Sequence, residues 1–367
     1  MYKYKDITDV HLEVTEKCNA ACPMCPRNIH GGKENPHIIN AELSLEDCKK
    51  MFDPAFIKQL RHMYMCGNYG DPIMAKDTLE IFKYFREHNP KIYLRMHTNA
   101  GARPAKWWVE LAKTIGKRGR VIFSVDGLED TNHLYRQNIK WKNVERGMKA
   151  YIGSGYSEAS WHFLAFKHNE HQYKEAETLA KELGFDTFLI KKTSRFYSYA
   201  GGNNGFQVLD KEGNNAHMLE PPTDENYQNA VAKTADQYIK KQGTTDLKEF
   251  YDMTKIDSKC ITKKEIFVSA RGLILPCCWV GGTLYRWELD DPQSNQSWEF
   301  INKVGGPDAI NAIKPWNTIE SILDKGNFFN DIENSWTLPS VKQGKLSVCT
   351  RMCATGLDKF SEQFNRN

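Results

Sequence analysis

Three cysteines near the N-terminus have the residue type and the spacing of ligands to one inorganic centre. Cys18, Cys22 and Cys25 fall within eight residues, separated by three and then two positions. A disulfide would leave one cysteine over, and a tetrahedral zinc site would lack its fourth ligand. A [4Fe-4S] cube normally takes four cysteines, so a loop of three favours a cube with one open iron. A chance cluster, or zinc with a distant fourth ligand, remains as an alternative.

The composition fits a folded protein that keeps its thiols reduced. Of the 367 residues, 40% are hydrophobic and 12% aromatic, which is typical of a globular chain. Lys and Arg number 50 against 46 Asp and Glu, and a net charge of +4 gives no reason to expect a nucleic-acid partner. No apolar run of about 18 residues predicts a membrane span. The first ten residues lack the apolar core of a signal peptide. We therefore expect a cytoplasmic protein whose ten cysteines are metal ligands or free thiols.

Six strand-like runs alternate with helix-like segments in the first half of the chain. The runs cover residues 10–14, 60–66, 92–96, 121–125, 161–166 and 185–190, with helices predicted at 77–88 and 171–183. This β–α–β rhythm indicates a parallel sheet, and parallel sheets bind ligands at the carboxyl ends of their strands. The cysteine loop and three polar clusters follow such ends, namely Gly70-Asp71-Pro72, Thr98-Asn99 and Ser124-Val-Asp126-Gly127. The run Lys191–Arg195 could also receive an anion there, although a solvated loop is the favoured interpretation.

The cysteine loop, placed after a first strand, resembles the signature of the radical S-adenosylmethionine enzymes over residues 8–195. The resemblance implies an α/β fold, a partial (β/α)6 TIM-like barrel over residues 1–198. It also implies that the open iron binds the amino and carboxylate groups of S-adenosylmethionine. An electron from the cube then cleaves the sulfonium, and the resulting 5′-deoxyadenosyl radical takes a hydrogen atom from the substrate. Flavodoxin or ferredoxin is the expected electron donor.

The same resemblance assigns cofactor contacts to the strand ends. Gly70 and Asp71 resemble a Gly-Glu-Pro turn that receives the methionine amino group, with aspartate in place of glutamate. Asn99 corresponds to a polar pair near the ribose, and Ser124 and Asp126 to a motif near the carboxylate and ribose. Two further positions complete the set: Met24, where relatives often carry an aromatic residue, and Arg136, which pairs with a carboxylate or forms a surface ion pair.

A second set of cysteines lies near the C-terminus and resembles the SPASM/Twitch extension of these enzymes, which holds auxiliary clusters. The full SPASM form includes a Cys-x2-Cys-x5-Cys run that is absent here, whereas the shorter Twitch form holds one cluster. The predicted ligands of one auxiliary [4Fe-4S] cube are Cys260, Cys277, Cys349 and Cys353. Spacing favours Cys277 over Cys278, and Gly272 would form the turn that returns the chain toward Cys260. A four-cysteine zinc site is the alternative.

The predicted organisation has three parts. Residues 1–198 form the barrel, and residues 199–258 form a polar linker or lid with one helix at about 224–241. Residues 259–367 form a small iron–sulfur domain of helices and one β-hairpin, whose strands are 266–269 and 273–275.

Three functions follow as hypotheses. The first is radical modification of a peptide or protein, because relatives with this extension often act on peptides. The second is a radical dehydrogenase of a small molecule of the cyclitol or sugar type. The third, from another class, is an iron–sulfur electron carrier. Cys66 and Tyr69 are the predicted catalytic residues that return a hydrogen atom, with Cys278 and Tyr197 as further candidates. His97 and His162 are expected to line the barrel interior, where one of them could touch the substrate.

Overall fold

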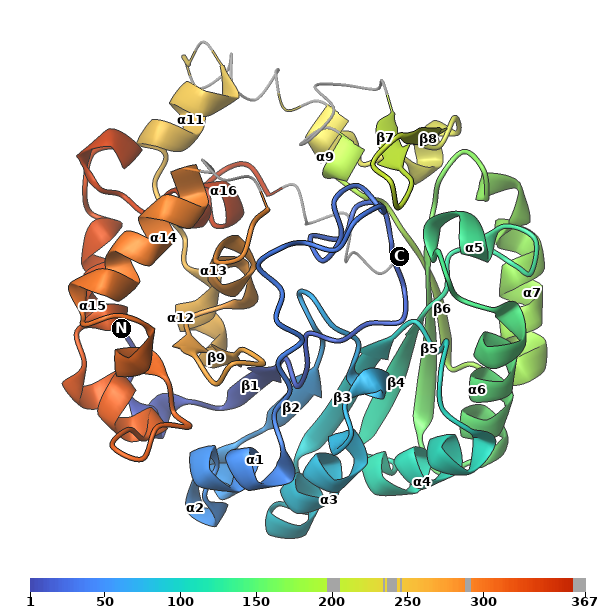
Figure 1. The fold of residues 1–367 in the computed structure, drawn as a ribbon, viewed down its shortest axis with the longest axis horizontal. Helices are drawn as coiled ribbons and strands as arrows, with labels where there is room; N and C mark the ends of the chain where they lie inside the picture. Colours follow the sequence, from blue (N-terminus) through green and yellow to red (C-terminus); the bar gives the residue numbers. More distant parts are fainter. Residues whose placement is uncertain (197–204, 234, 236–242, 245, 288–291, 359–367) are drawn as a thin grey trace.

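The protein folds around one curved, mostly parallel sheet. A computed structural model describes residues 1–196, 205–233, 235, 243–244, 246–287 and 292–358. The sheet has eight strands in the order β10-β9-β1-β2-β3-β4-β5-β6. Figure 1 shows β1 to β6 curving around a central space, with the C-terminal helices beyond β9 and β1 on the left. This is the predicted α/β architecture of a partial (β/α)6 barrel.

All six predicted strands of the barrel form, with ends shifted by a few residues. They are β1 (Asp9–Leu12), β2 (His62–Met65), β3 (Tyr93–Thr98), β4 (Gly119–Ser124), β5 (Glu158–Leu164) and β6 (Thr187–Lys191). Each pairs with the next in parallel. Consecutive parallel strands need crossover segments, and the helices between them supply these. The carboxyl ends of all six strands therefore share one rim.

The crossover helices lie mainly on the outer face of the sheet, as Figure 1 shows. They are α1 (Leu45–Met51), α2 (Pro54–Gln59), α3 (Thr78–His88), α4 (Ala105–Ile115), α5 (Asn132–Tyr135), α6 (Trp141–Gly153) and α7 (Tyr173–Leu183), with the short turns η1 (Tyr4–Asp6), η2 (Pro72–Met74) and η3 (Glu170–Gln172). The predicted helices at 77–88 and 171–183 correspond to α3 and to η3 with α7. Helix α7 ends at Gly184, whose φ of 87° is in the left-handed region that a C-terminal cap requires.

Alternation along the strands separates an apolar face from a polar one. On β3, Leu94 and Met96 are fully buried against the helices, whereas Arg95 and His97 are partly exposed on the inner face. Successive strand residues point to opposite faces, so the barrel interior receives polar side chains from every strand. The apolar layer holds the helices to the sheet, and the inner face is left for ligands.

The C-terminal segment continues the barrel sheet. Strand β9 (Glu265–Val268) pairs in parallel with β1, and β10 (Ile274–Leu275) pairs with β9 as the predicted hairpin. The hairpin turns at Gly272, whose φ is 80°. The helices of this part are α12 (Lys259–Lys263), α13 (Cys278–Thr283), α14 (Pro292–Lys303), α15 (Phe328–Ser335) and α16 (Ser347–Met352), with the turns η5 (Pro307–Ile310), η6 (Ser321–Lys325) and η7 (Val341–Gln343). One hydrophobic core includes residues of both parts. The predicted domain boundaries stay predictions.

The segment predicted as a polar linker contains an unpredicted hairpin. Strands β7 (Phe206–Leu209) and β8 (Asn215–Leu219) pair antiparallel around Asp210, which accepts the backbone N–H groups of a tight turn. The segment also holds η4 (Glu225–Tyr227), α9 (Ala230–Lys233) and α11 (Leu247–Met253). The predicted helix at 224–241 is therefore shorter where the chain is described, and most of its second half falls outside the described residues. No helix among the described residues has the length and apolar character to cross a membrane.

Candidate cofactor and substrate site

The three cysteines of the N-terminal loop line one cavity at the carboxyl rim of the sheet. This cavity has a volume of about 220 Å³. Cys18, Cys22 and Cys25 all face it, and none of them is in a disulfide. Gly70, Asp71, Asn99, Ser124, Asp126 and Arg136 face the same cavity. The structure thus brings together, at one place, nearly all the residues for which the sequence predicted contacts to a cube and its cofactor.

Asp71 and Asn99 fix the loops beside Cys18. The buried carboxylate of Asp71 accepts the backbone N–H of Asn99 at 2.7 Å and that of Ile73 at 3.1 Å. The Asn99 amide donates to Asn19 at 2.9 Å and lies 3.7 Å from the sulfur of Cys18. Burial raises the pKa of Asp71. A cationic amino group bound in the cavity would favour the ionised form of Asp71 and would be attracted to it.

Asp126 and Arg136 form an ion pair that reaches Cys22. The Nε of Arg136 lies 2.6 Å from Oδ2 of Asp126, whose side chain is only 1% exposed. The Nη1 atom of the same guanidinium lies 3.7 Å from the sulfur of Cys22. This ion pair lies in the cavity wall, and the predicted cofactor contact of Arg136 stays a prediction. A fixed positive charge here favours negative charge on the sulfur and on anything bound to it.

The side chains of Met24 and Tyr69 do not present a free polar group to the cavity. The Met24 side chain is buried and is not among the residues that line the cavity, while its carbonyl accepts a hydrogen bond from Arg195 at 2.9 Å. Tyr69 lines the cavity, but its hydroxyl donates to the carbonyl of Gly282 at 3.0 Å. Its position joins the two halves of the chain. The predicted roles of both residues stay predictions.

The run after β6 is part of the site, and the solvated-loop interpretation is wrong. Lys191, Thr193 and Arg195 line the cysteine cavity, and Thr193 and Ser194 are buried. Burial lowers the pKa of Lys191. Strand β6 extends to Lys191, which carries this run inward to the rim of the barrel. Lys191 and Arg195 of this run therefore face the cysteine cavity.

A second and larger cavity lies between the inner face of the sheet and the C-terminal helices. Its volume is about 790 Å³. His162 and Lys191 line both cavities, so the two spaces are neighbours. Cys66 and His97 line the larger cavity. Burial raises the pKa of the Cys66 thiol to about 11, which keeps its S–H bond intact at neutral pH. Tyr197, another predicted hydrogen-atom donor, falls outside the described residues.

The C-terminal cysteines meet at the far wall of this cavity. Cys260, Cys277, Cys278, Cys349 and Cys353 all line it. Electrostatic interactions connect Cys277 to Cys260, Cys278 and Cys349, and connect Cys260 to Cys353. Cys278 also interacts with Glu265 and Cys66 on the barrel side. The preference for Cys277 over Cys278 as the fourth thiolate of this set stays a prediction.

The separation between these thiols decides whether they could bind a single metal ion or a cluster. Within the described ranges, no three His, Cys, Asp or Glu side chains converge closely enough to share a single metal ion. A cube does not require such convergence, because each of its thiolates binds a different iron atom. Three thiols line the first cavity, the number that a cube with an open iron requires. The five C-terminal thiols at the second cavity include the four that a closed cube requires.

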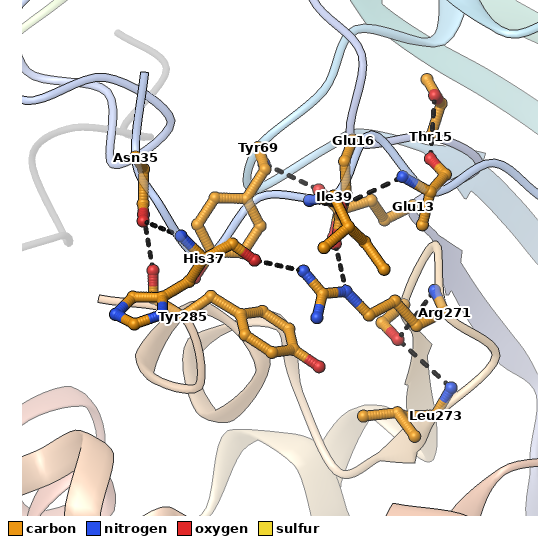
Figure 2. A network of polar contacts seen from close by, with 12 residues as sticks. Glu13, Thr15, Glu16, Asn35, His37, Ile39, Tyr69, Arg271, Leu273 and Tyr285 are labelled. Carbon is orange, nitrogen blue, oxygen red and sulfur yellow. Dashed lines mark hydrogen bonds and ion pairs between the residues drawn. The ribbon is translucent and has the colours of Figure 1, made fainter. Parts of the chain in front are cut away.

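Glu13 holds the turn that contains Gly70 and Asp71. It is 2% exposed, and its carboxylate accepts the backbone N–H of Tyr69 at 2.7 Å, as Figure 2 shows. The N–H groups of Asn68 and Gly70 also interact with it. Gly70 itself allows no side chain, because a Cβ atom would lie 1.9 Å from the Thr15 carbonyl oxygen. The buried carboxylate thus fixes the backbone that leads to Asp71.

Glu16 connects the cysteine loop to the C-terminal hairpin. Its carboxylate lies 2.6 Å from Nε of Arg271 and also accepts the N–H groups of Ile39 and Ala41 at 3.1 Å (Figure 2). The Arg271 guanidinium lies 3.7 Å from the ring centre of Tyr285. Charged residues of this kind are buried in proteins only when they are paired. Glu16 and Arg271 therefore join the segment before Cys18 to the turn of the C-terminal hairpin.

Sequence reasoning missed Glu13, Glu16 and Asn19. The sequence does contain a signal, because Glu13 and Glu16 lie in and just after the first strand-like run, before Cys18. Carboxylates that are buried there need partners. Those partners, such as Arg271, are far away in the chain. The pattern alone could therefore flag the two glutamates but could not say what they bind.

Comparison with known proteins gives one family match. Residues 12–190 match the sequence model of the radical SAM superfamily. Among solved structures, SuiB of Streptococcus suis bound to S-adenosylmethionine has a TM-score of 0.47 and 14% identity, over 74% of this chain and 60% of SuiB. BtrN in complex with AdoMet and 2-DOIA has a TM-score of 0.43 and 13% identity, over 98% and 97%. AnSMEcpe with bound AdoMet and the Cp18Cys peptide has a TM-score of 0.43 and 14% identity, over 74% and 73%. At these identities, none of the three assigns a substrate to this chain.

Proposed function

Because residues 12–190 belong to the radical SAM superfamily, we propose that this protein is a two-cluster radical enzyme. Cys18, Cys22 and Cys25 would hold a cube with one open iron, and S-adenosylmethionine would bind it in the cavity of about 220 Å³. The bound pair would supply reductive cleavage of the sulfonium and a 5′-deoxyadenosyl radical that takes a hydrogen atom from the substrate. The observation that carries the proposal is the meeting of three unpaired thiols with Asp71, Asn99 and Asp126 in one cavity.

The chain's own residues have distinct tasks in that cavity. Asp71 provides a buried carboxylate for the methionine amino group, on a turn that Glu13 fixes. Arg136, held by Asp126, provides a cation beside Cys22. Ser124 lines the cavity and provides a hydroxyl on the side of β4. Together these groups would position the nucleoside and amino-acid ends of the cofactor without moving the sheet.

The neighbouring cavity of about 790 Å³ is where we place the substrate. One end of it adjoins the cofactor cavity at His162 and Lys191, and the other meets Cys260, Cys277, Cys349 and Cys353. These four thiols would hold the auxiliary cube, whose contribution would be to accept the electron left on the substrate after hydrogen abstraction. A substrate held between the two sets would be within reach of both.

We propose a peptide or protein as the substrate, with one side chain in the cavity. Trp279 supports this choice, because it lines the cavity and yet is 41% exposed, as an aromatic contact for a ligand that continues outside would be. A small molecule is the second candidate, because the volume lies in the range of about 300–1,000 Å³ typical of small-molecule pockets.

Isotope transfer would separate these substrates. The reconstituted enzyme is mixed with unlabelled S-adenosylmethionine, dithionite and an extract of cells grown in deuterated medium, divided into peptide and small-molecule fractions. We expect deuterium to appear in 5′-deoxyadenosine with the peptide fraction. Deuterium with only the small-molecule fraction would select the second candidate. Cleavage without deuterium from either fraction would contradict hydrogen abstraction from both classes.

A further inference from the structure

The floor of the substrate cavity contains an arginine with a buried donor that no described residue accepts. Arg95 lies on the inner face of β3, where it pairs in register with Tyr64 on β2 and Arg120 on β4. Its guanidinium carbon lies 4.7 Å from the centre of the Tyr64 ring. Its Nε atom is buried and has no hydrogen-bond partner in the described part of the chain. A buried donor left in this state is costly unless a ligand satisfies it.

The adjacent Arg120 differs from Arg95 because its guanidinium has polar partners. Arg120 donates to the hydroxyl of Tyr93 at 2.9 Å and forms an ion pair with Glu158. Lys259, at the other side of the cavity, pairs with Asp358 at 2.7 Å. Arg95 has a stacking contact in place of such a carboxylate. The missing partner is therefore specific to Arg95 and is not shared by Arg120 or Lys259.

The charges along the cavity wall favour an anion. Its basic residues are Arg95, Arg120, Lys191, Lys259 and Lys263, against the acids Glu265 and Asp358. Glu158 and Asp358 offset Arg120 and Lys259. Glu265 is buried, accepts the hydroxyl of Tyr64 at 2.9 Å and interacts electrostatically with Lys263 and, more weakly, with Arg95. Basic residues of the cavity wall thus still outnumber the acids, which favours an anionic ligand.

We propose that Arg95 binds an anionic group of the substrate, a carboxylate or a phosphate. A guanidinium presents its donors as a planar fork, which matches both oxyanions better than an ammonium does. The inference rests on the proposed function, since it assigns chemistry to the substrate of the same cavity. For a peptide, the group would be an acidic or phosphorylated side chain, or the terminal carboxylate.

The strand register also sets the distance between this anion and the reacting carbon. Arg120 is level with Arg95, whereas Ser124, four residues further along β4, is level with His162. At about 3.3 Å per residue, these levels are separated by about 13 Å. Ile122 and Leu189 line the cavity in this region. The substrate portion between anion and reaction centre is therefore expected to be several bonds long.

Binding of simple anions tests the assignment. Acetate and inorganic phosphate are titrated into the reconstituted, S-adenosylmethionine-bound protein, with ligand-observed NMR as the readout. We expect Arg95→Gln to weaken binding of the preferred anion about tenfold or more, because a charge-assisted pair contributes about 1.4 kcal/mol or more. Arg118→Gln removes the same charge from an exposed position outside the cavity and should leave binding unchanged within about twofold.

The outcomes divide cleanly. Selective loss in Arg95→Gln supports the subsite, and the better wild-type ligand identifies its class as carboxylate or phosphate. Equal binding by wild type and variant, or no binding of either anion to wild type, overturns it. If Arg95→Gln does not fold, Arg95→Lys replaces it and must also weaken binding, since it loses the fork. Cleavage of S-adenosylmethionine by the wild-type preparation is measured in parallel and reports on the proposed function alone.

Discussion

Glu16 and Arg271 form an ion pair at 2.6 Å although 255 positions separate them in the chain. Glu16 stands two residues before Cys18, and Arg271 occupies the hairpin turn that leads to Cys277. The pair therefore joins the segments that carry the two cysteine sets. Because β9 also extends the sheet at β1, the relative placement of the two sets depends on backbone pairing and on this buried contact together.

Removing one member of this pair should destabilise the fold. The Glu16 side chain is 2% exposed, so Arg271→Met would leave an uncompensated buried carboxylate and lower the free energy of unfolding by about 3 kcal/mol. The double variant Glu16→Gln/Arg271→Met should recover part of that loss. Anaerobic urea unfolding measures both. As a control, Lys83→Gln breaks the exposed Lys83–Glu80 pair and should change stability by less than about 0.5 kcal/mol. Equal effects of Arg271→Met and Lys83→Gln would refute the structural role of the buried pair.

Glu13 should make stability depend on pH. Burial raises its pKa from 4.5 to about 7, despite the N–H groups around it. The folded state therefore keeps a proton that the unfolded chain has already released, and the stabilisation is lost as the pH rises toward 7. Relative to Glu13→Gln, the wild-type free energy of unfolding should fall by up to about 3 kcal/mol across this window. Urea unfolding at a series of pH values tests this. A difference between the two proteins that stays constant with pH would show that Glu13 is not protonated in the fold.

Arg136 should tune the electron affinity of a cube bound at Cys22. Its guanidinium lies 3.7 Å from that sulfur, and a positive charge stabilises the reduced, more negative state. Arg136→Gln is expected to lower the midpoint potential of the N-terminal cube by on the order of 50–100 mV, at an effective dielectric constant of about 20. Anaerobic redox titration followed by EPR measures the shift. The exposed Arg118→Gln is the control. An unchanged or raised potential in Arg136→Gln would disprove this electrostatic role.

The adjacent thiols Cys277 and Cys278 offer a matched pair of variants. Cys277→Ser should remove about four iron atoms per chain, because a closed cube needs its fourth thiolate. Cys278→Ser should keep the iron content of the wild type, because this thiol faces Cys66 and Glu265. Iron analysis and Mössbauer spectra of both variants decide between them. Iron loss in Cys278→Ser alone would reverse the assignment, and zinc in the wild-type site would replace the cube by the alternative metal.

Local patterns account for what could be predicted from the sequence. The spacing of Cys18, Cys22 and Cys25 and the alternation along β1 to β6 are local in the chain, and the strands form as predicted. The strand-end residues Asp71, Asn99 and Asp126 meet because parallel strands align their carboxyl ends, which is a consequence of topology that a pattern can anticipate.

What escaped prediction depends on long-range contacts. Nothing near Arg271 indicates that its partner is Glu16, and nothing near β9 indicates that it pairs with β1. The β7–β8 hairpin was missed because both strands are short and only β7 alternates between buried and half-buried residues, whereas β8 is exposed except at Leu219. Its turn is built by Asp210 and lacks the glycine-based two-residue signal of a tight hairpin. For Lys191 and Arg195, the general tendency of basic residues led to the wrong prediction. Basic residues in a loop usually face solvent, but here the strand carries them into the barrel mouth.

The central claim is that the N-terminal thiols hold a cube that cleaves S-adenosylmethionine. Its most direct test is anaerobic incubation of the reconstituted protein with S-adenosylmethionine and dithionite, with 5′-deoxyadenosine measured by mass spectrometry. Wild-type protein should form 5′-deoxyadenosine. Cys22→Ala should form none and should contain about four fewer iron atoms per chain, because the open cube depends on all three thiolates. No product from the wild type, or undiminished product from Cys22→Ala, would contradict the account.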